Sequence, residues 1–263
     1  LKADVSLDAN MVLSALTAAA TEGHADCVQL LVEANADMEA SYGAEGTPLR
    51  CADSEGHLAC VKTLIRLKAD VNAKDARGFT ALMSAVKHRQ VDCVQPLIDA
   101  KADIEAKYLG DITPLMVAVK QGSIECMKLL IAAKVDIASS ADHTLPPLFV
   151  AAKCHQTECM SLLLNAKADM HTIDAQGHDA LMVAADTGHI EGVRMLIALK
   201  ADIHATDHEG RTALMWAARL EHPGCAQLLI NAFLTLASKQ PRENEISQTQ
   251  NPGSSSKMKR KRR

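Results

Sequence analysis

Eight cysteines are the residues of this 263-residue chain best suited to metal binding or redox chemistry. Six of them share one position of a 33-residue spacing: Cys27, Cys60, Cys93, Cys126, Cys159 and Cys225. A metal site needs thiolates that converge on one point, whereas this spacing spreads single thiols along a row. If successive elements pack about 8–10 Å apart, the thiols are also too distant for disulfides, which need Cα atoms within about 7 Å. We therefore expect small buried apolar side chains in a reducing compartment, and no metal.

Other residues that could carry catalysis form incomplete patterns. Cys154, His155 and Cys159 are the tightest Cys/His group, but they lack a fourth ligand for zinc. Phosphate-binding glycine loops, the nucleophile elbow and the zinc-protease motif are missing from the sequence. Residues 189–191 match half of a zinc-deaminase signature, and residues 254–257 match S-x-x-K only in a polar tail. The chain is therefore predicted to be no enzyme, with no cofactor and no small-molecule substrate.

Leucine and alanine recur every 33 residues along most of the chain. Seven leucines follow one another at this spacing without an insertion: Leu16, Leu49, Leu82, Leu115, Leu148, Leu181 and Leu214. An alanine stands three residues after each of them, and a second leucine row runs from Leu31 to Leu229. A sustained period of this length indicates a repeat protein, in which each unit packs on its neighbours. Aromatic residues make up only 2% of the chain, which favours many thin cores over one large core.

Each unit has the pattern of a helix, a turn, a second helix and an extended loop. A capping residue precedes most of the first helices: Ser14, Thr47, Thr80, Thr113, Asp179 and Thr212, with Pro146 in this place in the fifth unit. A glycine ends the first helix in four units, at Gly23, Gly56, Gly122 and Gly188. The second helix carries an apolar stripe, as in Cys60, Val61 and Leu64. The polar stretch after it is predicted to form a hairpin-like finger.

At these residues the sequence resembles the ankyrin repeat family. The carriers are "GTPLRCADSEGHLACVKTLIRLKADVNAKDARG" (residues 46–78) and "RTALMWAARLEHPGCAQLLI" (residues 211–230). The resemblance implies an all-α repeat solenoid, an ankyrin-like stack of helix-turn-helix units with hairpin fingers. It covers residues 1–238, as a partial repeat at 1–8 followed by seven units of 33 residues. A disordered basic tail is expected at residues 239–263.

Two positions depart from the family pattern. The histidine that often follows Thr-Pro-Leu is replaced by Thr17, Arg50, Met83, Met116, Phe149, Met182 or Met215, so we expect apolar packing there. The glycine that usually ends the second helix is replaced by Asn35, Lys68, Lys101, Lys134, Lys167 or Lys200. A left-handed turn costs a residue other than glycine about 1 kcal/mol, partly offset because lysine complements a helix C-terminus.

The resemblance implies that partners bind on the concave face, at the fingers and the exposed ends of the first helices. Projected onto this sequence, these positions are Tyr42, Lys74, Arg77, Phe79, Lys87, His88, Lys107, Tyr108, Lys120, Gln121 and Lys153. Residues 239–263 hold eight Lys and Arg against two Glu, a net charge of +6. Because the whole chain has a net charge of −4, residues 1–238 have a net charge of −10. A general polyanion binder is not built this way. A protein partner with an acidic segment fits a basic stripe on an acidic background. Solvated lysines without a partner are the alternative.

Several single residues have two interpretations. Tyr42 and Tyr108 occupy one finger position, where each is either an interface anchor or a filler folded onto its own finger. Phe149 and Trp216 are expected to pack in the core. Arg50 and Asp53 replace apolar residues three positions apart, so they are expected to pair with each other.

The last seven residues hold six positive charges: Lys257, Lys259, Arg260, Lys261, Arg262 and Arg263. Such a run resembles a nuclear-import signal recognised by an import carrier. Contact with nucleic acid or anionic lipid, or a solubilising terminus, are the alternatives. The sequence has no apolar run of about 18 residues and no signal peptide pattern, which predicts an intracellular protein, nuclear or nucleo-cytoplasmic, without a membrane span.

Two functions of different class fit this sequence. The first is a non-catalytic protein–protein interaction scaffold. The second is a substrate-recruiting array of a larger enzyme, such as a kinase or ubiquitin ligase, with its catalytic part upstream. The chain begins inside a repeat at Leu1, which favours a C-terminal piece of a longer array.

Overall fold

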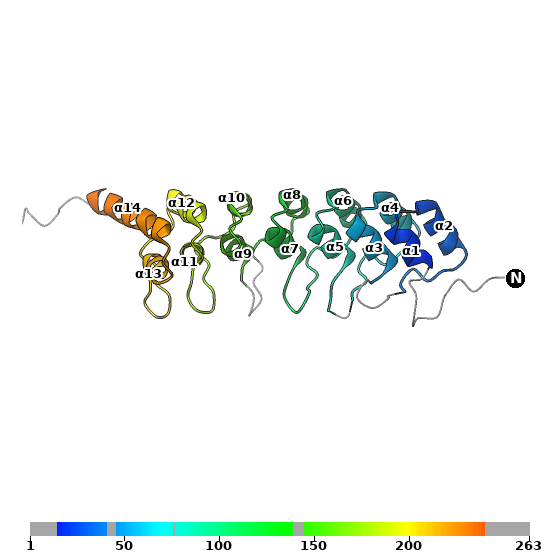
Figure 1. Ribbon diagram of the computed structural model, residues 1–263, viewed down its shortest axis with the longest axis horizontal. Helices are drawn as coiled ribbons and strands as arrows, with labels where there is room; N and C mark the ends of the chain where they lie inside the picture. Colours follow the sequence, from blue (N-terminus) through cyan, green and yellow to red (C-terminus); the bar gives the residue numbers. More distant parts are fainter. Residues whose placement is uncertain (1–14, 41–45, 76, 139–144, 240–263) are drawn as a thin grey trace, which may run out of the picture.

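The computed structural model describes residues 15–40, 46–75, 77–138 and 145–239. These residues form fourteen helices in seven pairs, stacked side by side. Figure 1 shows two rows, with the odd-numbered helices beside the loops and the even-numbered helices on the other side. Their bounds are α1 (Ala15–Thr21), α2 (Ala25–Glu33), α3 (Pro48–Glu55), α4 (Leu58–Arg66), α5 (Ala81–Lys87), α6 (Val91–Asp99), α7 (Pro114–Gln121), α8 (Ile124–Ala132), α9 (Pro147–Lys153), α10 (Thr157–Asn165), α11 (Ala180–Asp186), α12 (Ile190–Ala198), α13 (Ala213–Arg219) and α14 (Pro223–Lys239). The predicted all-α repeat solenoid is confirmed.

The predicted caps are confirmed before α3, α5, α7, α11 and α13, while Ser14 lies outside the described residues. Thr80 Oγ1 accepts a hydrogen bond from the backbone N–H of Met83 at 3.3 Å, and Asp179 Oδ1 accepts one from Met182 at 2.8 Å. Each bond satisfies one of the N–H groups that a helix N-terminus leaves without a partner. Pro146 makes no such bond before α9, where Pro147 occupies the first turn. A missing N–H costs nothing in that turn.

The turn between the two helices of a pair explains its glycine. Gly23 has a φ of 79°, and a Cβ there would lie 2.7 Å from Nδ1 of His57 in the following repeat. The other ring nitrogen of His57 bonds to the carbonyl oxygen of Thr21 at 2.8 Å. Gln90 and His222 fill the same place against Gly56 and Gly188. Glycine is therefore required twice, for the left-handed backbone and for the side chain of the next repeat.

The second helices end in the left-handed turns that the sequence predicts. Their residues with positive φ are Asn35, Lys68, Lys101, Lys134, Lys167 and Lys200, at φ values from 64° to 73°. None of them is glycine, so the left-handed backbone after each even-numbered helix from α2 to α12 slightly lowers the stability of the fold.

The two leucine rows form the continuous core. Leu82, Leu115 and Leu130 are completely buried, as expected for residues that touch two neighbouring repeats. Apolar packing in place of the family's histidine is confirmed at Met83 and Met116, but Met215 is 54% exposed. Met215 lies on α13, the last first helix of the stack, and no later repeat among the described residues covers it.

Arg50 and Asp53 do not form the predicted pair. Arg50 Nη1 lies 2.8 Å from Oδ2 of Asp75, a finger residue of the next repeat. Asp53 is completely buried, and neither carboxylate oxygen has a hydrogen-bond partner within the part of the chain that the structure describes. Burial raises the pKa of Asp53 well above its ordinary value, because the charged form loses its solvation.

Candidate partner-binding surface

An aspartate closes most of the described fingers. Asp75 Oδ1 accepts hydrogen bonds from the backbone N–H groups of Arg77 and Phe79, both at 2.9 Å. Asp174 and Asp207 make the same two bonds in later fingers. A side chain that accepts from its own following backbone is a strong turn former. This bond pattern explains why the predicted fingers form without a long strand ladder.

Tyr108 stands at the same finger position and closes its finger differently. Its backbone N–H and carbonyl oxygen exchange two bonds of 2.9 Å with Ile112. The phenol ring packs edge-on against Phe79 of the preceding finger, with ring centroids 4.9 Å apart. Such pairs add about 0.5–1.5 kcal/mol to the burial of the rings. Tyr108 is half-buried, so it is both finger filler and part of the surface.

Two cations lie beside the Phe79 ring. Lys87 Nζ is 5.7 Å and Arg50 Cζ is 5.9 Å from the ring centroid, both within reach of its negative face. Arg50 comes from α3, Lys87 from α5, and Phe79 and Tyr108 from two fingers. We call these four side chains the aromatic–cationic cluster. It joins three consecutive repeats at the base of their fingers.

The predicted basic stripe divides into paired and open lysines. Lys74 Nζ lies 3.9 Å from Asp103, and Lys107 Nζ lies 3.8 Å from Asp111. Lys87, Lys120 and Lys153 are exposed at the ends of α5, α7 and α9, and none of the described residues offers them an ion pair. These last three, which we call the lysine ladder, occupy one repeat position at spacings of 33 residues.

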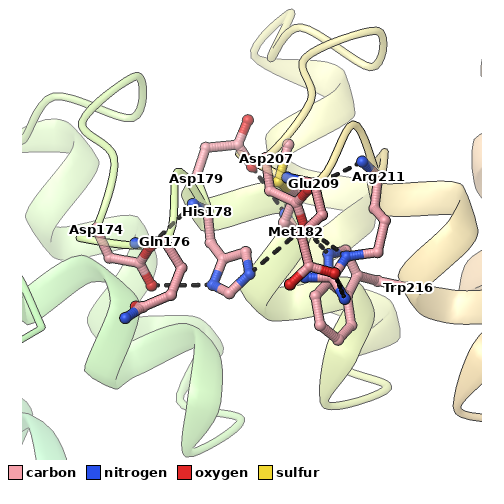
Figure 2. A network of polar contacts seen from close by, with 9 residues as sticks. All are labelled: Asp174, Gln176, His178, Asp179, Met182, Asp207, Glu209, Arg211 and Trp216. Atoms are coloured by element: carbon pink, nitrogen blue, oxygen red, sulfur yellow. Dashed lines mark hydrogen bonds and ion pairs between the residues drawn. The ribbon is translucent and has the colours of Figure 1, made fainter.

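The fingers near the C-terminal end present a different arrangement. Asp207 has a fully buried side chain that accepts from Arg211 Nε at 2.8 Å and from Trp216 Nε1 at 3.1 Å, besides its two finger bonds. His178 Nδ1 lies 3.0 Å from Asp174, and its Nε2 lies 3.6 Å from Asp207. Figure 2 shows this imidazole between the carboxylates of two successive fingers, where it is hydrogen-bonded to Asp174.

The electrostatics of Asp207 follow from these donors. Burial alone would raise the pKa of Asp207, but hydrogen bonds from the backbone and side chain of Arg211 outweigh it and hold the pKa well below its ordinary value. The Arg211 guanidinium also lies 4.2 Å from the Trp216 ring centroid. We call Asp174, His178, Asp207, Arg211 and Trp216 the end network. Trp216 therefore packs on the core and anchors a finger, while Phe149 is completely buried as predicted.

The remaining predicted residues lie around the cluster or outside it. Arg77 and His88 are exposed and Gln121 is half-buried. The carbonyl oxygen of Gln121 accepts from Arg89, a residue that the sequence interpretation missed. Tyr42 and the basic run at residues 257–263 lie outside the described residues. The contact of the buried Arg50 with Asp75 and Phe79 was also missed, although an arginine at an apolar repeat position was the available signal.

The cysteine row is mostly the buried row that was predicted. Cys60, Cys93, Cys126, Cys159 and Cys225 are completely buried, and burial raises the pKa of the Cys93 thiol to about 12. Cys27 is exposed instead, because no described repeat covers the outer side of α2. The Cys154, His155 and Cys159 group does not converge. Cys154 is exposed, Cys159 is in the core, and His155 stacks on His189 and bonds to Thr187.

Comparison with known proteins agrees with this arrangement. A family model described as ankyrin repeats (3 copies) matches residues 16–108, 68–141, 107–174 and 148–240. The chain belongs to the ankyrin repeat family. The structure of the human ASB11 ankyrin repeat domain is 26% identical, with a TM-score of 0.73, over 84% of this chain and 98% of that one. The ankyrin repeat domain of Bcl-3, a member of the IkappaB protein family, is 25% identical, with a TM-score of 0.74, over 85% and 100%.

A search of curated protein sequences finds no match. Ankyrin repeat domains are generally scaffolds for protein–protein interaction, and they are generally non-catalytic. None of the described helices is long and apolar enough to cross a membrane.

Proposed function

We propose that the chain is a scaffold that binds an acidic segment of a protein partner on its concave face, at the aromatic–cationic cluster and the lysine ladder. The observation that carries this proposal is the open charge of Lys87, Lys120 and Lys153, which no described carboxylate neutralises. Complementary charge steers association and selects partners. The half-buried Phe79 and Tyr108 rings beside Lys87 supply apolar area, as interface anchors usually do.

Charge reversal of the ladder tests this proposal. The triple variant K87E, K120E and K153E is compared with K62E, K128E and R194E, which reverses three exposed charges at one position of the second helices. Partners captured from cells and quantified by mass spectrometry should fall in the ladder variant and remain with the control. An unchanged set of partners in the ladder variant would remove the proposed site.

We also propose that the basic run at residues 257–263 is read by a nuclear-import carrier. Six cations in seven residues support it. A fluorescent reporter fused to residues 239–263 should accumulate in the nucleus, and changing the six Lys and Arg to Gln should abolish this. A reporter that stays in the cytoplasm contradicts the import role.

A further inference from the structure

We propose that the acidic partner segment binds as a polyproline II helix, with an acidic side chain at every third residue. This inference rests on the proposed function, because it assigns a conformation and a spacing to the partner of the same surface. It follows from the geometry of the lysine ladder and from the aromatic side chains beside it.

The first step is the spacing of the ladder. Lys87 and Lys153 are the last residues of α5 and α9, and Lys120 is the last but one of α7. The helices α5, α7 and α9 pack in sequence, each on the next. Packed helices lie about 8–10 Å apart, so the three helix ends that carry the ammonium groups recur at about that interval. A partner that pairs with all three lysines must present its acidic groups at the same interval and on one side.

The second step compares the regular conformations of a bound segment. A polyproline II helix rises about 3.1 Å per residue with three residues per turn, so every third side chain points the same way, about 9 Å further on. A β-strand covers a similar distance in three residues, about 10 Å. Side chains three residues apart in a strand point to opposite faces, however, so they cannot all meet the lysines. An α-helix needs about seven residues for this distance, which leaves two turns between contacts.

The third step is the aromatic–cationic cluster at one end of the ladder. Phe79 and Tyr108 form an edge-to-face pair across two fingers, and Lys87 lies over the Phe79 ring. Aromatic side chains that line a groove are the usual docking surface for polyproline II segments, because the stiff ligand loses little entropy. This cluster favours the polyproline II helix over the α-helix with seven-residue spacing.

The ladder also has ends. The equivalent position is Ser54 before it and Asp186 after it. A fourth acidic group would meet no cation at Ser54 and a like charge at Asp186. The matching segment therefore carries three acidic residues, at positions i, i+3 and i+6.

Synthetic peptides of one composition test the spacing. Each contains three Asp in a Pro-rich background, placed at i, i+3, i+6, or at i, i+1, i+2, or at i, i+2, i+4. Binding to the full chain is measured by fluorescence anisotropy at low salt, with a helical peptide of spacing seven as a fourth ligand. The spacing of three should bind about tenfold more tightly than the clustered peptide, because it forms two more ion pairs. Equal affinities, or preference for another spacing, overturn the inference.

A charge swap separates this inference from the proposed function. K120E should weaken the spacing-three peptide, and replacing the central Asp of that peptide with Lys should restore its affinity; failure of this rescue overturns the assigned register. If all acidic peptides bind equally but lose affinity in the ladder variant, the spacing fails and the proposed site stands. If the ladder variant and the second-helix control bind all the peptides alike, both fail.

Discussion

Tyr108 and Asp207 occupy the same position of two fingers that lie three repeats apart. Asp207 accepts four hydrogen bonds, and the cation beside it is neutralised within the end network. Tyr108 closes its finger through its backbone alone, in two bonds with Ile112, and its ring packs on Phe79, which lies beside the ammonium group of Lys87, unpaired among the described residues. The same repeat position therefore carries a side chain with saturated hydrogen bonds in one finger and an aromatic ring near an unpaired lysine in another.

Two carboxylates sharpen this comparison. Asp207 is buried with four donors, whereas Asp53 is buried on α3 with no hydrogen-bond partner among the described residues. The donors lower the pKa of Asp207, while burial raises the pKa of Asp53. Burial thus stabilises a carboxylate only where the surrounding backbone and side chains supply the donors.

Removing Asp207 should have the largest effect. D207A deletes the acceptor of four bonds and leaves Arg211 and the indole N–H without it, so the last repeats should unfold several degrees earlier. The fluorescence of Trp216, the only tryptophan of the chain, reports this locally. D75A is the matched variant. It should lose less thermal stability than D207A, because Asp75 accepts three hydrogen bonds and is more exposed. Equal losses would remove the contrast between the fingers.

The pH dependence of the end network has a definite sign. Because the pKa of Asp207 is lowered in the folded chain, its stabilisation is complete above about pH 4, the ordinary value for Asp. It is lost as the pH falls further, since the unfolded state then binds more protons. Thermal unfolding of the wild type from pH 5 to pH 2 should show a decline that D207N reduces. A parallel decline in D207N contradicts the assignment.

Replacing Asp53 should have the opposite effect. D53V introduces the residue found at the equivalent Val86 and Val119, and it should raise the free energy of unfolding by about 1–3 kcal/mol. Because burial raises the pKa of Asp53, wild-type stability should fall as the pH rises above about 4. This part of the pH dependence should be absent in D53V. Urea unfolding at pH 5 and pH 8 measures both, and a destabilised D53V would contradict them.

Converting the open finger into a closed one should change binding more than stability. Y108D restores the aspartate of the other fingers, so the finger should remain folded through the two backbone bonds that Asp75 makes. Affinity for an acidic peptide should fall about tenfold, since a ring is lost and a like charge is added. Y108F is the control and should bind as the wild type does, because the ring contact with Phe79 remains. If Y108D also binds unchanged, Tyr108 is only a filler of its finger.

Thiol labelling gives the mildest test of the same contrast. Cys27 and Cys154 are exposed and should react at once with a thiol reagent, whereas Cys93 and Cys225 are buried with raised pKa values. In low urea, Cys225 in the last repeat should be labelled before Cys93 in the middle, because a terminal repeat has fewer neighbours. Simultaneous labelling, read by mass spectrometry, would mean that the stack unfolds as one unit.

The repeat architecture was predictable because a period of 33 residues fixes the helix starts, the turns and the core positions together. Caps, turn glycines and leucine rows recur at fixed places, so one unit explains the next. Three residues that depart from the repeat pattern, Arg50, Tyr108 and Trp216, lie in the aromatic–cationic cluster and the end network. Their partners were not predictable. Whether Arg50 meets Asp53 on its own helix or Asp75 in the next finger depends on tertiary geometry, and so do the carboxylates that neutralise Lys74 and Lys107.

Each turn glycine is gripped by the histidine or glutamine of the following repeat, as at Gly23, Gly56 and Gly188. At these glycines the contact runs from each repeat back to its predecessor, whereas Arg89 and His155, which replace the glycine in two units, bond forward to Gln121 and Thr187. A pulling force on the two ends of the chain should therefore detach the C-terminal repeat first, because no later repeat among the described residues holds its turn, whereas His57 holds the turn of the first described repeat. The end-to-end length of the chain would then increase in steps that correspond to the unfolding of one 33-residue repeat.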